Sequence, residues 1–218
     1  MDPAFWQDKW TRGEIGFHLP FVNPKLIEHW PALGVSPGAR VLVPLAGKTL
    51  DLGWLRAQGH AVVACELSEL AAREFFAEAD LTPQVTEVGS FLHLAAGGIE
   101  YFVGDFFALV ANLLGPVQGL YDRGALVALP PDLRARYVQR LRELTGPGTR
   151  TLLITLEYDQ SQMNGPPFSV PEAAVLAAFG GTHDLSLRSR EGILHEEPRF
   201  AARGVTALDS CVWTLVRR

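Results

Sequence analysis

Residues 41–66, VLVPLAGKTLDLGWLRAQGHAVVACE, constrain the fold of this chain more than any other stretch of its sequence. They begin with the apolar run 41–43, which is typical of a parallel strand covered on both faces. Pro44 ends that strand, because proline cannot continue a central ladder. A glycine turn, a helix at about residues 50–58 and a second strand at residues 61–65 follow. This order predicts a βαβ unit, in which a crossover helix joins two parallel strands.

Strands and helices alternate along most of the remaining chain. Further strands are predicted at residues 99–103, 119–121 and 151–156, and an amphipathic helix separates the last two. Two longer strands, at about residues 183–190 and 205–216, are close enough in sequence to pair as an antiparallel hairpin. We therefore predict an α/β fold with a doubly wound, mostly parallel sheet and an antiparallel terminal hairpin.

The first 35 residues are predicted to be mainly helical and rich in aromatic side chains. A helix starts at Asp2-Pro3 and carries three aromatic residues, Phe5, Trp6 and Trp10. A glycine-containing loop with Phe17 follows. This region is either an aromatic helix packed on the core or a lid whose rings cover a flat ligand, and composition alone favours the first reading. No linker separates residues 1–35 from the rest, so a single domain is expected over residues 1–218.

Composition excludes several classes of partner. The formal net charge of -5 gives no electrostatic reason to expect nucleic acid, and no run of Lys or Arg would hold an anionic membrane. No apolar stretch reaches the roughly 18 residues of a transmembrane helix, and the N-terminus does not read as a secretory signal. Cys65 and Cys211 both fall in predicted strands and are expected to be reduced thiols. A monomeric cytoplasmic protein that acts on a small molecule is expected.

Five side chains lie just past the ends of predicted strands: Leu45, Glu66, Asp105, Arg123 and Tyr158. Ligands of doubly wound sheets bind outside the carboxyl ends of the strands. These residues are distant in sequence, but the fold predicts that they are neighbours in space.

The turn and the acid of the βαβ unit limit the choice of ligand. Glu66 is placed to accept hydrogen bonds from both hydroxyls of a ribose, although it could be only a solvated acid. A pyrophosphate needs several glycines for close backbone approach, and the turn supplies one, Gly47, so NAD and FAD are disfavoured. The sequence Gly47-Lys48-Thr49 resembles a phosphate loop, but Leu42 stands where its first glycine is needed. S-adenosylmethionine, which has a ribose and no pyrophosphate, suits this turn better.

Metal and nucleophile signatures are weak. None of the six histidines shows the paired spacing of a zinc site, and no G-x-S-x-G elbow occurs. We therefore predict no metal ligand and name no catalytic acid, base or nucleophile.

Four segments together resemble the thiopurine S-methyltransferase family, and specifically its bacterial branch. They are FWQDKWTRGEIGFH (5–18), the stretch from VLVPLAGKT to ELSELAAREFF (41–76), YDRGALVAL (121–129) and GPPFSVP (165–171). The segments are spread over most of the chain and occur in the order of the family. The combination of PLAGKT with the later GH-VV-x-E-x-SE pattern is quite specific.

The resemblance implies a seven-stranded class I methyltransferase fold with S-adenosylmethionine as methyl donor and residues 1–35 as a lid. It implies cofactor contacts at Trp10, Leu45, Glu66, Asp105, Phe106 and Arg123. It also implies that Phe17 touches the acceptor, with Arg123 as a second acceptor contact. Animal members differ in this region, with Ser-Ile at the Asp105-Phe106 pair and Trp at Tyr121.

The implied reaction is displacement of S-adenosylhomocysteine by the sulfur of a thiopurine or another aromatic or heterocyclic thiol. The resemblance extends to selenium and tellurium compounds, which points to metalloid detoxification. Arg123 would hold an anion, or else it pairs with Asp122 or Asp105. Two other functions remain open at this point: a nicotinamide-dependent oxidoreductase, and a methyltransferase fold that binds without catalysing.

Overall fold

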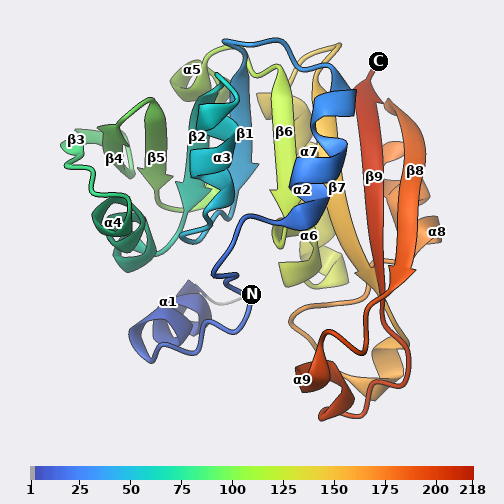
Figure 1. Cartoon of the computed structure of the whole chain (residues 1–218). Coiled ribbons are helices and arrows are strands. Elements are labelled where there is room, and N and C mark those ends of the chain that lie inside the picture. Colours follow the sequence, from blue (N-terminus) through green and yellow to red (C-terminus); the bar gives the residue numbers. More distant parts are fainter. Residues whose placement is uncertain (1–2) are drawn as a thin grey trace.

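A mixed sheet of nine strands runs through the part of the protein that the computed structural model describes, residues 3–218 (Figure 1). In spatial order its strands are β3 (Gln84–Val88), β4 (Phe91–Ala96), β5 (Ile99–Val103), β2 (Ala61–Glu66), β1 (Arg40–Pro44), β6 (Gly119–Arg123), β7 (Arg150–Glu157), β9 (Asp209–Arg217) and β8 (His183–Gly192). The five strands from β5 to β7 are parallel to one another. The outer strands pair antiparallel, so the predicted α/β fold and its antiparallel terminal hairpin are confirmed.

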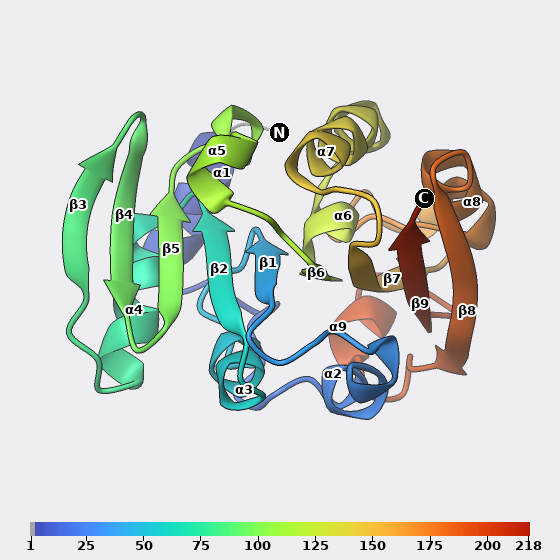
Figure 2. The same cartoon turned by 90° about the horizontal axis from the view of Figure 1, so that it is seen from above.

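Helices cover both faces of this sheet (Figure 2). One face carries α2 (Pro24–His29), α3 (Asp51–Ala57) and α4 (Glu69–Glu78), and the other carries α5 (Ala111–Leu114), α7 (Pro131–Leu144) and α8 (Glu172–Phe179). The short helix α6 (Ala125–Ala128) is buried in the core on the side of α7. Two further helices, α1 (Pro3–Thr11) and α9 (Pro198–Ala201), lie at the ends of the strands. Short 3-10 turns lie at η1 (Pro31–Leu33), η2 (Phe106–Ala108) and η3 (Gln160–Gln162).

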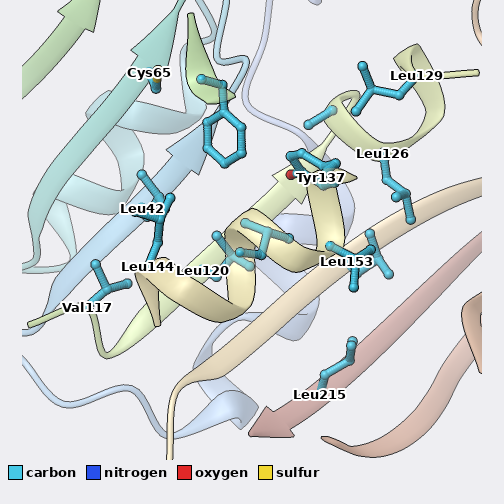
Figure 3. Close-up of a cluster of buried hydrophobic side chains, with 14 of the residues drawn as sticks. Leu42, Cys65, Val117, Leu120, Leu126, Leu129, Tyr137, Leu144, Leu153 and Leu215 are labelled. Atoms are coloured by element: carbon cyan, nitrogen blue, oxygen red, sulfur yellow. The ribbon is translucent and has the colours of Figure 1, made fainter. Parts of the chain in front are cut away.

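The central strands are buried on both sides because their sequences are continuous apolar runs. In β1, Leu42 packs into the core under α7, whereas Val41 and Val43 pack into the core under α3. Figure 3 shows the first of these cores, in which Tyr137 from α7 and Cys65 from β2 lie among aliphatic side chains. Each fully buried aliphatic side chain contributes about 1.5–3 kcal/mol, so these two cores hold the central strand ends rigidly in place.

The sheet is larger than expected because β3 and β4 extend it. This hairpin, QVTEV–GS–FLHLAA, was not predicted, since β3 is a largely exposed edge strand without an apolar face. The last strand also starts later than predicted, at Asp209 rather than near residue 205, because α9 and the turns after it lead into it. The predicted helix at the N-terminus is present as α1, but its proposed cap, Asp2, lies outside the described residues.

The carboxyl ends of the parallel strands meet at one edge of the sheet. In Figure 1 the arrowheads of β1, β2 and β6 point to the lower edge, where α1 lies on one side and α9 on the other. None of the helices formed by residues 3–218 combines the length and the apolar composition of a membrane-spanning segment.

Candidate active site

The turn that follows β1 has an unusual backbone conformation. Leu45 has a φ of 48°, a left-handed conformation that costs a residue with a branched side chain about 1–2 kcal/mol, and Gly47 has a φ of 57°. Neighbouring groups hold this conformation. The amide of Ala46 donates to the carbonyl of Cys65 at 3.1 Å, and the Tyr101 hydroxyl donates to the carbonyl of Gly47 at 3.1 Å. Backbone strain that is held this firmly is typical of ligand-binding sites.

Glu66 connects the end of β2 to this turn. Its side chain is only 7% exposed, and its two oxygens accept from the amides of Gly47 at 2.7 Å and Ser68 at 2.9 Å. Burial raises the pKa of Glu66, and the backbone amides of Ser68 and Gly47 oppose that rise. An ionised carboxylate has about four acceptor positions, so Glu66 keeps acceptor capacity for further donors. The two hydroxyls of a ribose match this requirement, so the residues present fit an adenosine ligand.

The N-terminal aromatic residues lie on the same turn. Trp10 is 5% exposed and belongs to neither core of the sheet. Its ring lies so close to Gly47 that a Cβ on that glycine would be 3.0 Å from Cζ2 of the indole. Phe17 packs edge-on against Trp6 and Trp10, with ring centroids 5.6 Å apart in both pairs. The aromatic segment therefore packs on the turn after β1 and lies outside the two cores of the sheet.

Arg123, at the end of β6, reaches this aromatic segment. Its Nη1 donates to the carbonyl oxygen of Phe17 at 2.8 Å. Among the described residues its partner is this carbonyl and neither Asp105 nor Asp122, which are engaged elsewhere. A guanidinium has five N–H donors, so Arg123 keeps donors for an anion. The neighbouring His18 has a lowered pKa, chiefly because it is partly buried and secondarily because of the charge of Lys48.

Asp105 and Phe106 follow the end of β5, as predicted, but the Asp105 side chain is exposed and the Phe106 side chain is buried. The exposed Asp105 accepts from the amide of Phe107 at 2.9 Å and so caps η2. The Phe106 ring points into the core, with its centroid 5.2 Å from that of Tyr137. Phe106 can therefore meet a ligand at this edge only through its backbone.

Tyr158, the fifth strand-end residue, does not join the others. It is buried in a separate small cluster with Met163 and Phe200, and its hydroxyl donates to the carbonyl of Pro167 at 2.6 Å. Burial raises the pKa of this phenol. Its role is to fix the long loop after β7, where the amide of Phe168 also bonds to the carbonyl of Val127 at 2.6 Å.

A buried carboxylate behind the turn was missed in the sequence. Asp51, the first residue of α3, accepts from the amide of Asn23 at 2.8 Å and from the hydroxyl of Tyr121 at 2.9 Å. It thereby ties the start of α2 and the centre of β6 to the first turn of α3. The sequence alone indicated only an acid in the first turn of a helix, because both partners are distant in sequence.

Lys48 ties the turn to α4. Its ammonium lies 2.9 Å from a carboxylate oxygen of Glu74 and 2.6 Å from one of Glu78. Burial acts to lower the pKa of Lys48, but the ion pairs with Glu78 and Glu74 together outweigh burial and raise that pKa. Lys48 is thus a structural residue here, and it does not play the phosphate-binding part that a phosphate loop would assign to it.

The described residues form neither a metal-binding cluster nor an activated cysteine nucleophile. No group of three or more His, Cys, Asp or Glu side chains within residues 3–218 is arranged to hold a metal ion. Cys65 and Cys211 are free and buried, as predicted. Burial raises the pKa of both thiols, that of Cys211 to about 11, so neither is an activated nucleophile.

Comparisons with known proteins agree with this geometry. A family model described as thiopurine S-methyltransferase matches residues 1–218. The chain is 49% identical over 218 residues to the thiopurine S-methyltransferase of Pseudomonas fluorescens (strain SBW25), with 100% of both chains covered. It is 48% identical over 218 residues to the thiopurine S-methyltransferase of Bordetella petrii, again with 100% of both covered.

Solved structures share the fold at much lower sequence identity. One is a SAM-dependent methyltransferase from Thiobacillus denitrificans in complex with S-adenosyl-L-homocysteine, with a TM-score of 0.65 at 17% identity, covering 100% of this chain and 99% of the other. Another is a SAM-dependent methyltransferase from Anabaena variabilis, with a TM-score of 0.68 at 14% identity, covering 99% of this chain and 95% of the other. These similarities concern the fold alone.

Proposed function

This chain belongs to the thiopurine S-methyltransferase family, and we propose that it transfers the methyl group of S-adenosylmethionine to the sulfur of a thiopurine or another aromatic or heterocyclic thiol. The observation that carries the proposal is the pairing of the one-glycine turn with Glu66. The carboxylate is held by the amides of Gly47 and Ser68 and keeps acceptor positions for a ribose. A turn with a single glycine does not let the backbone approach a pyrophosphate as closely as the several glycines of a dinucleotide site do.

The cofactor would lie along the carboxyl edge of β1, β2 and β5. Glu66 would hold the ribose hydroxyls, and the backbone at Leu45 would approach the methionine portion. The adenine would lie near Asp105 and the backbone of Phe106. Trp10, packed on Gly47, would close over the donor. Among the residues of the lid, 1–35, this indole supports the cofactor assignment most directly.

When bound, S-adenosylmethionine supplies an electrophilic methyl group on a sulfonium, and S-adenosylhomocysteine is its leaving group. The protein has to align the acceptor sulfur with that methyl group and to exclude water. An anionic thiolate and a cationic donor neutralise each other as the new C–S bond forms, so a dry site favours the reaction. Aromatic thiols ionise readily. A strong general base is therefore not needed, and none is proposed.

The acceptor would lie between the lid and the loop after β7. Phe17, held edge-on between Trp6 and Trp10, offers a ring for an aromatic acceptor. Arg123 is anchored through Phe17 and keeps donors for the thiolate or a ring carboxylate. Residues 164–170 would form the far wall, and Arg134 supports that wall by donating to the carbonyl of Ser169 at 3.0 Å.

The acceptor in the cell is proposed to be a small molecule, either a heterocyclic thiol or a selenium or tellurium compound. We propose that a monomer is the active form. The family resemblance supports the chalcogen acceptors, and thiopurines serve as convenient probes of the same chemistry.

A transfer assay with a methyl-¹³C donor tests the proposal. The purified protein is incubated with labelled S-adenosylmethionine and 6-mercaptopurine, and the product is examined by NMR. We expect a labelled S-methyl resonance that grows with time and with enzyme concentration. Labelled methyl on nitrogen only, or no transfer to any member of a panel of thiols, selenols and chalcogen oxyanions, would contradict it.

A further inference from the structure

The two peptide groups that flank the Cα of Gly47 are each bonded to a different buried side chain. The amide of Gly47 donates to Oε2 of Glu66 at 2.7 Å. The carbonyl of Gly47 accepts from the hydroxyl of Tyr101 at 3.1 Å. Glycine is the most permissive residue type, and together these bonds restrain both of its rotatable backbone angles, with φ at 57°. Glu66 and Tyr101 therefore act on one residue of the turn from two adjacent strands, β2 and β5.

The position of the Tyr101 hydroxyl is fixed by the packing of its ring. The side chain is fully buried, and the ring centroid lies 5.4 Å from that of Phe75 and 5.5 Å from that of Phe76, both on α4. Burial, and secondarily the charge of Glu66, raises the pKa of this phenol well above its usual value. The hydroxyl therefore keeps its proton and acts as a donor. A phenylalanine would fill the same space, so packing alone does not explain the hydroxyl.

The helix that packs on Tyr101 also supports the residue after Gly47. The ammonium of Lys48 pairs with Glu74 and Glu78 of α4. These two acids flank the aromatic pair that contacts the Tyr101 ring. The peptide group between Gly47 and Lys48 is therefore supported from α4 at both of its ends, through the tyrosine at the carbonyl and through the ion pairs at the lysine.

We propose that Tyr101 is a positioning residue for the cofactor, because its hydroxyl holds Gly47 in the conformation in which the Gly47 amide meets Glu66. That bond orients the carboxylate, and the orientation of the carboxylate sets how well a ribose can be bound. The inference rests on the proposed function, which supplies the ligand, S-adenosylmethionine. Tyr101 is buried behind the turn, so it should affect how tightly the cofactor binds and not how fast the bound methyl group is transferred.

Tyr101→Phe removes the hydroxyl and keeps the ring. Loss of one neutral hydrogen bond should raise the dissociation constant of S-adenosylhomocysteine, measured by isothermal titration calorimetry, by about 3- to 10-fold. Thr149→Val is the matched control. It removes a buried hydroxyl that donates to the carbonyl of Val117 at 2.9 Å, at the amino ends of β6 and β7, and it should bind as the wild type does. An unchanged dissociation constant for folded Tyr101→Phe would overturn the proposal.

Steady-state kinetics separates positioning from a simple loss of stability. A protein that is only destabilised loses active molecules, which lowers the apparent kcat and leaves KM unchanged. Tyr101→Phe should instead raise KM for S-adenosylmethionine and leave kcat as in the wild type when both substrates are saturating. The opposite pattern, a lower kcat with an unchanged KM, would contradict a positioning role.

A double-mutant cycle shows whether Tyr101 acts through Glu66. Both side chains bond to Gly47, so the effect of Tyr101→Phe on binding of S-adenosylhomocysteine should be smaller in a Glu66→Gln background than in the wild type. Additive effects of the two substitutions would show that the tyrosine acts independently of the carboxylate and would overturn the proposal.

Hydrogen exchange in the ligand-free protein separates failure of this inference from failure of the proposed function. The amide of Gly47 should exchange faster in Tyr101→Phe than in the wild type or in Thr149→Val, because its bond to Glu66 depends on the conformation of the turn. This measurement needs neither a cofactor nor turnover. A wild-type protein that does not bind S-adenosylhomocysteine would contradict the proposed function, whereas equal exchange of this amide in all three proteins would refute the role of Tyr101.

Discussion

Glu66→Gln is the substitution that separates the charge of this side chain from its shape. The side chain is buried, and its oxygens accept from the amides of Gly47 and Ser68 at 2.7 and 2.9 Å. Glutamine keeps one acceptor oxygen, but its NH₂ group must face one of these amides or one ribose hydroxyl. At least one donor therefore loses its acceptor, and the remaining bonds are no longer made to a charged group.

The size of the effect follows from those bonds. A hydrogen bond to a charged group contributes about 1.5–3 kcal/mol, and about 1.4 kcal/mol corresponds to a tenfold change in affinity. Loss of one such bond to the ribose should weaken binding of S-adenosylhomocysteine by about 10- to 100-fold. Glu66→Ala removes both and should weaken it by more than an order of magnitude.

Isothermal titration calorimetry with S-adenosylhomocysteine is the appropriate assay. Glu69→Gln is the matched control, because Glu69 is an exposed acid on α4 whose ion pair with Arg73 is half exposed. It should bind as the wild type does. Circular dichroism establishes that both variants are folded. An unchanged dissociation constant for folded Glu66→Gln would refute the assignment of Glu66 to the ribose.

Two further substitutions test the turn and a buried acid. Gly47→Ala forces alanine to a φ of 57° and puts its Cβ 3.0 Å from the Trp10 ring, so we expect a melting temperature several degrees lower and weaker cofactor binding. Gly53→Ala, in the open middle of α3, should instead be neutral or stabilising, and equal behaviour of the two in thermal melts would contradict the role of the turn. Burial raises the pKa of Asp122 from 3.8 to about 6 despite its bond from Tyr137, so the folded protein keeps this proton to a higher pH than the unfolded chain does. Its ionisation should therefore lower stability by about 3 kcal/mol as the pH rises from about 4 to above 6. Asp122→Asn cannot ionise, so calorimetry should find the variant gaining stability relative to the wild type over this range, and parallel pH profiles would contradict the assignment.

The centre of the site can be predicted from the sequence because its residues lie close together along the chain. The apolar run before Pro44, the single glycine at position 47 and the acid at position 66 lie within one βαβ unit, and the structure brings Gly47 and Glu66 into direct contact. Their positions just past the ends of adjacent parallel strands are therefore enough to predict that they lie together. The same rule misjudged Tyr158, because the rule places a residue at an edge but does not say which way its side chain turns.

Other features of the structure depend on contacts between residues that are distant in sequence, and a local sequence pattern does not reveal such contacts. Asp51 receives hydrogen bonds from a residue 28 positions before it and from another 70 positions after it. The β3–β4 hairpin was missed for a different reason. Its outer strand is exposed and polar, so it lacks the apolar alternation by which strands are recognised.

A crystal structure of the complex with S-adenosylhomocysteine tests the central claim most directly. We predict that both ribose hydroxyls donate to the carboxylate of Glu66, that the homocysteine portion lies against the backbone at Leu45, and that its sulfur faces Phe17. An adenosine group bound elsewhere, with Glu66 still bonded only to the amides of Gly47 and Ser68, would contradict this account of the site.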